Sequence, residues 1–226
     1  MNIGIIGSGN IGSTLAGYLT DLGHEVMISN SRGPESLSDV AHKTEAVPVT
    51  TQEAAKAKDL IIIAIPAKAI GKLPTDLLRV SNAIVIDAGN YYPSRDGQIA
   101  EIGNGLTDSE WVAKVIAHPV IKAFNNILAA SLASKAVPVG SEGRVALSVA
   151  GDDNSQKETV IKLIEEIGFD AIDGGVLAES WRQQPGTPAY CKDLNKEDLH
   201  AALAKAEMSK REAYRAEADE MARPYL

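Results

Sequence analysis

Residues 2–12 read NIGIIGSGNIG, and the fold is decided in this stretch. The apolar run over 2–6 predicts a buried strand, and the glycine pattern G-x-G-x-x-G follows it at once. Apolar residues then recur at helical spacing until Gly23, which is placed to end a helix. Strand, glycine turn and helix in this order are the context in which the pattern binds a dinucleotide.

Each glycine of the pattern has its own task. Gly7 allows the tight turn, Gly9 lets the backbone approach a pyrophosphate, and Gly12 lets the helix pack closely on the strand. Unpaired N–H groups and the positive dipole end of the helix favour the phosphates. A glycine turn without function is the alternative interpretation, and the flanking strand and helix argue against it. The residues expected at the pyrophosphate are Gly7, Ser8, Gly9, Asn10, Ile11 and Gly12.

The exit of the second strand indicates which dinucleotide is bound. Residues 25–29 predict that strand, and Asn30, Ser31 and Arg32 follow it where an NAD-binding protein carries Asp or Glu for the ribose 2′-hydroxyl. A hydroxyl and a guanidinium can bind a 2′-phosphate, whereas a carboxylate would repel it. The sequence therefore favours NADP over NAD. The alternative interpretation of Arg32 is a solvated loop cation.

Composition and charge restrict the partners. The formal net charge of −8 over 226 residues argues against nucleic acid or an anionic membrane. Cys191 is the single cysteine, so an internal disulfide and a cysteine-based metal cluster are excluded. No signal-peptide pattern is visible, and the longest apolar stretch, 60–67, is too short to cross a bilayer. We expect a soluble cytoplasmic protein without a metal site.

Apolar runs alternate with helical segments along the chain, which predicts right-handed crossovers and a doubly wound parallel sheet. The expected further strands are 46–49, 60–65, 83–87, 120–124, 144–150 and 169–173. We expect an α/β Rossmann domain, including the acceptor cleft, over 1–175, with a small C-terminal lobe. Residues 176–226 are expected to form a helical segment with one long helix over about 195–221. This segment would close the cleft or join the subunits of a homodimer.

Ligands of such a sheet bind outside the carboxyl ends of the strands. The expected neighbours of the cofactor's ribose and nicotinamide are Ile65, Pro66, Ala67 and Asn90. The residues expected to face a second substrate, the hydride acceptor, are Asn125, Asn126, Ile127 and Leu128. Turn formation and helix capping are the alternative explanation for the asparagine pair.

Candidates for acid–base catalysis are few. His118 lies at the entering end of its strand, opposite the expected site, and Cys191 has no activating neighbour in sequence. Tyr91, Tyr92 and His118 are the candidate proton donors for a substrate that needs one. We assign no catalytic residue. Direct hydride transfer between two bound cofactors is favoured, because it chiefly needs proximity and orientation.

These motifs together resemble the family of coenzyme F420-dependent NADP oxidoreductases, from Met1 to about Tyr190. The resemblance rests on the glycine loop, Ser31-Arg32, Ile65-Pro66, Asn125 and Gly151-Asp152-Asp153. Residues 122–125, Lys-Ala-Phe-Asn, are also similar to the NADPH–flavin reductase domain of membrane metalloreductases. The resemblance implies a compact, usually dimeric Rossmann protein that exchanges hydride between NADPH and a deazaflavin, coenzyme F420, or a flavin.

Two other functions stay open at this point. The first is an NADPH-dependent reductase of a small imine or carbonyl substrate. The second is a non-catalytic protein that senses NADPH. Hydride transfer to an acceptor separates an enzyme from a sensor.

Overall fold

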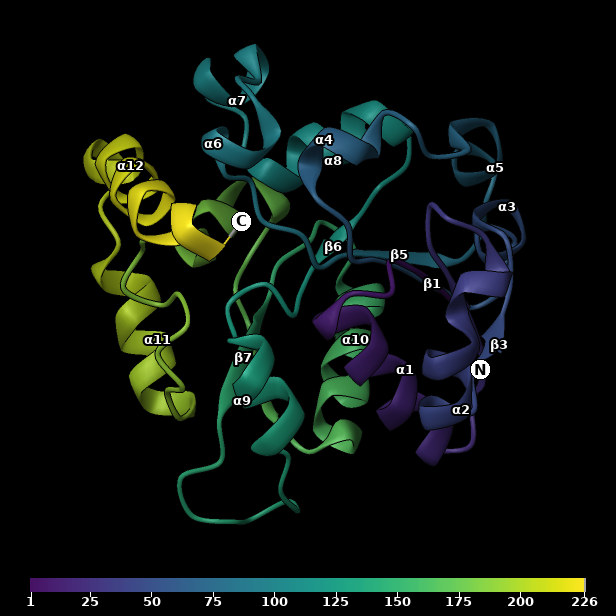
Figure 1. Ribbon diagram of the computed structural model, residues 1–226. Coiled ribbons are helices and arrows are strands. Elements are labelled where there is room, and N and C mark those ends of the chain that lie inside the picture. The colour runs from purple at the N-terminus through teal and green to yellow at the C-terminus, as the bar shows by residue number, and fades with distance from the viewer. Residues whose placement is uncertain (226) are drawn as a thin grey trace.

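The computed structural model describes residues 1–225, which form a six-stranded parallel sheet between two helical layers (Figure 1). The strand order is β3-β2-β1-β4-β5-β6. The strands are β1 Asn2–Ile6, β2 Glu25–Ser29, β3 Val47–Pro48, β4 Leu60–Ile63, β5 Ile84–Asp87 and β6 Ile121–Lys122. The doubly wound α/β fold expected from the sequence is confirmed.

Helices connect each strand to the next and cover both faces of the sheet. The first ten are α1 Asn10–Asp21, α2 Ser38–Thr44, α3 Thr51–Ala54, α4 Ala67–Ile70, α5 Thr75–Arg79, α6 Pro93–Asp96, α7 Ala100–Gly103, α8 Asp108–Ile116, α9 Ala129–Ser134 and α10 Asn154–Ile167. A 3₁₀ turn, η1 Pro34–Leu37, leads into α2. Pro74 separates α4 from α5 and stands at the N-cap of α5, a position where its missing N–H costs nothing.

The core has two halves, one on each face of the sheet. Alternate residues of β1 and β4, such as Ile3 and Ile62, pack against α1 and α10. Ile61 and Ile63 point the other way, toward Val112 of α8. All of β4 is buried, as expected for a parallel strand covered on both faces. Figure 1 shows α1 and α10 on one side of the sheet and α4 and α8 on the other.

A small two-stranded parallel sheet lies beyond β6. It consists of β7 Ala146–Val149 and β8 Asp170–Asp173. The backbones of Lys122 and Ala150 exchange hydrogen bonds of 2.7 and 3.0 Å across an antiparallel bridge, which joins this sheet to β6. The strand expected over 120–124 is shorter than predicted. Its chain leaves the sheet at Phe124, whose φ of 62° is left-handed.

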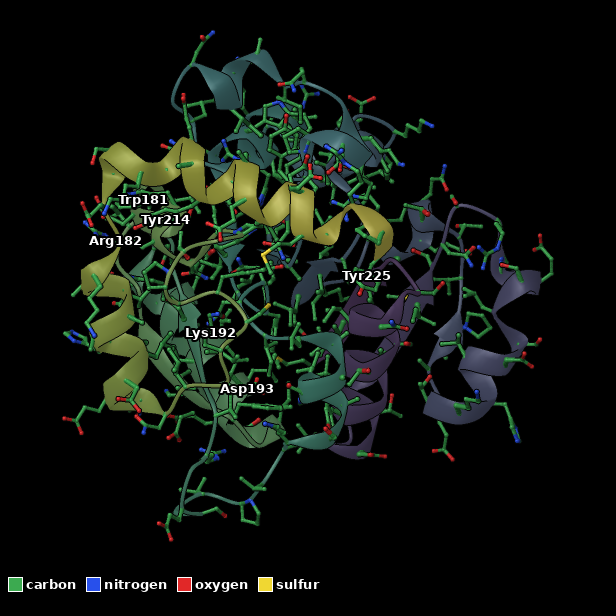
Figure 2. The ribbon with its side chains drawn as sticks, turned by 60° about the vertical axis from the view of Figure 1, so that its left-hand side comes forward. Trp181, Arg182, Lys192, Asp193, Tyr214 and Tyr225 are labelled. Atoms are coloured by element: carbon green, nitrogen blue, oxygen red, sulfur yellow. The ribbon has the colours of Figure 1, made fainter. Side chains whose placement is uncertain are left out.

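The C-terminal helix expected over 195–221 is divided into two, which corrects the sequence prediction. α11 Lys196–Lys205 ends at Ala206, whose backbone is extended, and a 3₁₀ turn, η3 Met208–Lys210, leads into α12 Arg211–Ala222. The Arg182 guanidinium donates to the carbonyls of Leu203 at 3.4 Å and Ala206 at 3.2 Å. These bonds pair carbonyls that a helix end leaves free. Figure 2 shows Arg182 where the two helices meet.

Polar contacts hold α12 against the segment that carries α6 to α8. Arg215 Nη2 lies 3.0 Å from the buried Asp108 carboxylate. The Asp219 carboxylate accepts hydrogen bonds from the backbone N–H of Ser94 at 3.0 Å and from its hydroxyl at 2.8 Å. Arg211 donates to the carbonyl of Gly105 at 2.7 Å. Charge and hydrogen bonding, more than apolar burial, therefore place this helix.

None of the helices within residues 1–225 combines the length and the apolar character needed to cross a bilayer.

A buried ion pair ties β5, β6 and α8 together. Lys122 is fully buried, and its Nζ lies 3.0 Å from Asp87 Oδ2 and 2.5 Å from the carbonyl oxygen of Gly89. Ser109, on α8, donates to the same Asp87 oxygen at 2.6 Å. Two buried charges are tolerated here because each has its opposite charge and further hydrogen bonds.

We expect Lys122→Ala to lower the free energy of unfolding by about 3–5 kcal/mol, because it leaves the Asp87 carboxylate buried without its cation. Chemical denaturation followed by circular dichroism measures the change. The matched control is Lys114→Ala, whose exposed pair with Glu101 contributes at most about 1 kcal/mol. A Lys122 variant as stable as the Lys114 variant would contradict this role of the pair.

Candidate functional site

Close packing explains two glycines of the loop between β1 and α1. A Cβ on Gly7, whose φ is 120°, would lie 2.2 Å from the carbonyl oxygen of Ala64. A Cβ on Gly12 would lie 1.9 Å from the carbonyl oxygen of Gly7. Gly9 differs, because a Cβ there would meet no atom of the chain within 4 Å. The loop is thus packed on its inner side and open on its outer side at Gly9.

The open side of the loop presents the start of α1. Gly9 is the N-cap of this helix and supplies no side-chain hydrogen bond, and the first turn contains no acidic residue. The first N–H groups of a helix have no intrahelical partner and carry the positive end of its dipole. This end of α1 is therefore suited to an anion such as a pyrophosphate.

A cleft of about 680 Å³ lies in front of the loop, within the size range of small-molecule sites. Its lining includes eight residues named from the sequence: Gly7, Ser8, Gly9, Asn30, Ser31, Arg32, Ile65 and Pro66. The lining also contains Ile6, Gly33, Thr50, Thr51, Gln52, Ala64, Ala69, Lys72, Leu73 and Pro74. The last eight, from Thr50 to Pro74, come from the segments after β3 and β4, which only the parallel sheet brings to the same edge.

The Asn30 side chain organises the loop that follows β2. Its Oδ1 accepts a hydrogen bond from the Arg32 N–H at 2.8 Å, and its Nδ2 donates to Ser36 Oγ at 2.9 Å and to Ser8 Oγ at 3.3 Å. The loop is thereby fixed to the glycine loop. Ser31 and Arg32 are exposed, and within residues 1–225 the Arg32 guanidinium has no ion-pair partner.

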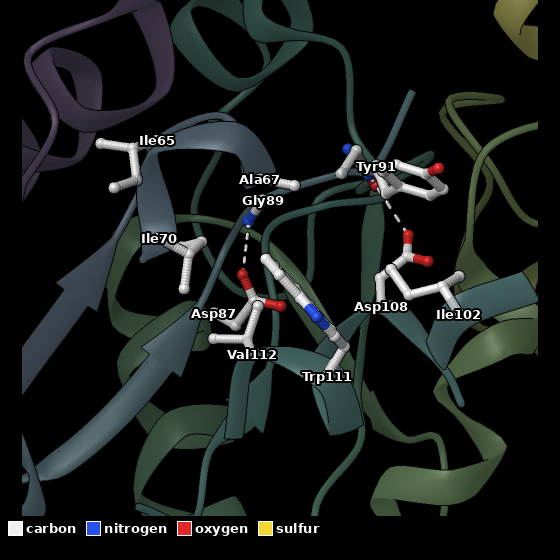
Figure 3. Close-up of a pocket in the computed structure, with 11 residues that line it drawn as sticks. Ile65, Ala67, Ile70, Asp87, Gly89, Tyr91, Ile102, Asp108, Trp111 and Val112 are labelled. Carbon is white, nitrogen blue, oxygen red and sulfur yellow. Dashed lines mark hydrogen bonds between the residues drawn. The ribbon is translucent and has the colours of Figure 1, made fainter. Parts of the chain in front are cut away.

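The other expected cofactor neighbours lie outside this cleft lining. Asn10, Ile11 and Gly12 form the first turn of α1, behind the glycine loop. Ala67 and Asn90 line a separate interior cavity, which they share with Ile65 (Figure 3). Its volume of about 10 Å³ is close to the space of a single water molecule. This cavity is too small for an organic substrate.

Carboxylates reach this cavity from two sides, and both are already paired. Asp87 accepts from the Gly89 N–H at 2.9 Å and Asp108 from the Tyr91 N–H at 3.3 Å, as the dashed lines of Figure 3 show. Trp111 covers much of the remaining wall with apolar surface. The cavity therefore belongs to the packing beneath the β5 exit.

The Asn125 side chain lies at the centre of a buried amide network. Its Nδ2 donates to Asn90 Oδ1 at 3.1 Å and to the carbonyl oxygen of Gln183 at 2.7 Å. Gln183 Nε2 donates back to Asn125 Oδ1 at 2.8 Å. Gln183 belongs to η2 Leu177–Gln183, so the network joins the β6 exit to the C-terminal segment. The sequence offers no local signal for this pairing across 58 positions.

The four residues expected at the acceptor do not share one surface. Asn125, Asn126 and Ile127 are buried, and Leu128 is 51% exposed. Asn126 Oδ1 lies 3.4 Å from the backbone nitrogen of Ser148. Contact of these residues with a hydride acceptor stays a prediction, and the structure adds a packing role for Asn125.

Two tyrosine hydroxyls meet beside this network. Tyr92 and Tyr190 are joined by an O–O distance of 2.6 Å, and Asn90 Nδ2 lies 3.4 Å from the Tyr190 hydroxyl. Burial raises the pKa of both tyrosines, so both hydroxyls keep their protons at neutral pH. The sequence suggested Tyr92 but not Tyr190, which arrives from a distant part of the chain.

The other acid–base candidates are directed elsewhere. The Tyr91 hydroxyl donates to the carbonyl of Gly97 at 2.9 Å. His118 contacts the carbonyl oxygens of Pro119 and Ser81 at the entering ends of β6 and β5, as its position in the sequence predicted. Burial raises the pKa of the Cys191 thiol to about 11, which keeps it in the unreactive protonated form.

Comparisons with known proteins support a common origin for this arrangement. Residues 2–91 match the family described as "NADP oxidoreductase coenzyme F420-dependent". Over 57 residues the chain is 49% identical to the protein YjhV of Escherichia coli K12; this match covers 25% of the chain and 42% of YjhV, less than half of that relative.

Solved structures extend the likeness to most of the chain. A hypothetical protein from Sinorhizobium meliloti is 34% identical, with a TM-score of 0.75, over 87% of this chain and 96% of that one. A protein from Arthrobacter sp. FB24 described as an F420-dependent NADP-reductase is 23% identical, with a TM-score of 0.65, over 80% and 87% of the two chains, and it shares the fold. The match around the glycine loop shows that residues 2–91 belong to the coenzyme F420-dependent NADP oxidoreductase family, and the nearly full-length likeness to the Sinorhizobium protein extends the shared fold over most of the chain.

Proposed function

We propose that this protein transfers hydride between NADPH and a deazaflavin, coenzyme F420, or a flavin that binds at the carboxyl ends of the strands. The observation that carries the proposal is the cleft formed by the glycine loop and the β2 exit. Its lining combines the open face of Gly9 with the exposed Arg32 and contains no carboxylate.

The residues of the cleft fit NADPH by their chemistry. The N–H groups at the start of α1 would hold the pyrophosphate, and Ser31 and Arg32 would bind the 2′-phosphate. Ile65 and Pro66 offer backbone groups and little bulk beside the ribose and nicotinamide. When bound, the nicotinamide supplies or accepts the hydride. The chain's task is to orient it and to keep water away from it.

The acceptor side is supported by position. β5 lies next to β4 in the sheet and β6 lies next to β5, so a second ring would stack between the exit loops of β5 and β6. Hydrogen bonds among Asn90, Asn125 and Gln183 make this wall rigid. The family description and the Arthrobacter protein's name support coenzyme F420 as the acceptor.

The organisation of the chain follows from this arrangement. We propose that residues 1–175 form the NADP-binding domain with the acceptor cleft, and that residues 176–226 close it or join a homodimer. The contacts of η2 with Asn125 and of α12 with Asp108 support the closing role.

The first test mixes the purified protein with NADPH and oxidised coenzyme F420, with a flavin alongside. We expect loss of the deazaflavin's visible absorbance at a rate proportional to protein concentration. Bleaching of the flavin alone would reassign the acceptor. Tight NADPH binding without hydride transfer to either acceptor would contradict the proposal and leave two functions, reduction of a small imine or carbonyl and a sensing role.

Reduction of a small imine or carbonyl is the second candidate, and the Tyr92–Tyr190 pair favours it. Such a reaction needs a proton on the nitrogen or oxygen that receives the electron pair when hydride adds to carbon. Tyr92 would donate that proton, and Tyr190, 2.6 Å away, would replace it.

For an imine or carbonyl substrate, we expect Tyr92→Phe to lower kcat by about 10²–10⁴-fold, the usual contribution of a positioned acid, without changing the Kd for NADPH. Steady-state kinetics and fluorescence titration measure the two quantities. Tyr91→Phe is the matched control, since its hydroxyl is bonded to the carbonyl of Gly97. If both variants keep wild-type kcat, the pair has no acid role.

The glycine loop allows binding and packing to be separated. We expect Gly9→Val to keep the free energy of unfolding within about 1 kcal/mol while strongly weakening the binding of NADPH, because a Cβ at this position meets no atom of the chain within 4 Å and the side chain would occupy the cleft. Gly12→Ala should instead destabilise the fold by about 1–3 kcal/mol or more, because its methyl group would overlap the Gly7 carbonyl. Thermal unfolding and NADPH titration test both variants; an unchanged NADPH affinity in Gly9→Val would contradict the placement of the pyrophosphate.

A further inference from the structure

The two charged side chains of the cofactor cleft come from opposite walls. Arg32 stands on the loop after β2, and Lys72 stands on the segment that joins α4 to α5. Both are cationic, and no carboxylate is among the residues that line the cleft. In the whole chain, acidic residues outnumber Lys and Arg by 30 to 22. The cleft is therefore a positive site on an acidic protein.

Neither cation forms an ion pair with a carboxylate of the described chain. Within residues 1–225, neither Arg32 nor Lys72 takes part in an ion pair. The acidic residue next to the Thr50–Gln52 part of the lining is Glu53, and its carboxylate caps α3. It accepts hydrogen bonds from the Thr50 N–H at 2.8 Å and the Thr50 hydroxyl at 2.7 Å.

The backbone that carries Lys72 is well anchored, although its side chain is exposed. The Lys72 N–H donates to the carbonyl of Ala69 at 3.0 Å, and the next N–H, that of Leu73, donates to Ile70 at 3.1 Å. Both Ile70 and Leu73 are buried, with 1% and 8% of their surface exposed. The Lys72 side chain has a flexible four-carbon stem, so its ammonium can follow an anion in the cleft.

We infer that Lys72 is a second determinant of the preference for NADPH over NADH, acting on the 2′-phosphate from the wall opposite Arg32. This inference rests on the proposed function, because it assigns the cleft to NADPH. The 2′-phosphate carries close to two negative charges at neutral pH, so Arg32 alone leaves it incompletely neutralised. An ammonium from the opposite wall completes the charge balance, and the NADH 2′-hydroxyl gains little from it.

The test uses two pairs of ligands that differ by the same phosphate: NADPH with NADH, and 2′,5′-ADP with 5′-AMP. We expect Lys72→Ala to raise the Kd for NADPH and for 2′,5′-ADP about three- to tenfold at low ionic strength, in line with one charge-assisted contact at an exposed site. The Kd for NADH and for 5′-AMP should stay within about twofold of the wild-type value, because these ligands lack the 2′-phosphate on which Lys72 acts. Isothermal titration calorimetry measures all four.

Matched variants separate charge from position. Lys68→Ala removes an exposed lysine from α4, outside the cleft lining, and should leave every Kd unchanged. Lys72→Arg keeps the charge and should retain most of the preference. Arg32→Ala should weaken the phosphorylated ligands in the same selective way. Raising the salt concentration should reduce the loss caused by Lys72→Ala, since exposed charges are screened.

The outcomes distinguish this inference from the proposed function. If the wild-type protein binds 2′,5′-ADP no more tightly than 5′-AMP, the assignment of the cleft to NADPH is wrong, and so is the role of Lys72. If the wild-type protein prefers the phosphorylated ligands and Lys72→Ala keeps the full preference, only the inference is overturned. Equal weakening of NADPH and NADH by Lys72→Ala would also overturn it. Thermal unfolding of each variant checks that the fold is intact.

Discussion

The close approach of α1 to the end of β1 is the constraint on which the rest of the structure depends. The helix begins so near the strand that no Cβ fits at Gly12, and the turn before it requires the left-handed backbone of Gly7. This packing directs the free N–H groups of α1 toward the carboxyl edge of the sheet. The central place of β1 in the sheet then brings the exits of β2 and β4 to either side of those groups. The main cleft of the protein lies between these three segments.

Buried polar pairing organises the other half of the same edge. Lys122 and Asp87 join β5 to β6, and the amides of Asn125 and Gln183 join β6 to the C-terminal segment. Such groups are costly to bury unless every partner is present, so they specify one arrangement of the strand exits. The exits of β5 and β6 are therefore built from fixed polar contacts. The hydroxyl pair of Tyr92 and Tyr190 lies within this fixed frame.

Electrostatics in this protein are local. A chain with a formal charge of −8 would repel an anionic ligand at long range, yet the lining of its main cleft carries cations without carboxylates. Screening by salt limits the reach of the distant acidic residues to about 10 Å, whereas the cations in the cleft are close to any ligand there. The potential at the cleft thus depends on the few side chains that line it. The net charge bears on other properties, such as solubility.

The sequence by itself determined the parallel α/β fold, the glycine loop and the Ser31–Arg32 pair, because each is encoded by neighbouring residues in a periodic pattern or a short motif. The tertiary structure alone decided which distant residues join them. Lys72 reaches the Arg32 cleft because parallel strands end at one edge. Tyr190 meets Tyr92, and Gln183 pairs with Asn125, because the C-terminal segment packs against the exits of β5 and β6. The break between α11 and α12 also comes from a contact between distant residues. The alanine-rich sequence favours one continuous helix, but the Arg182 side chain, from η2, donates to the carbonyls of Leu203 and Ala206. Contacts between residues far apart in the chain leave no local pattern, so only the folded structure reveals them.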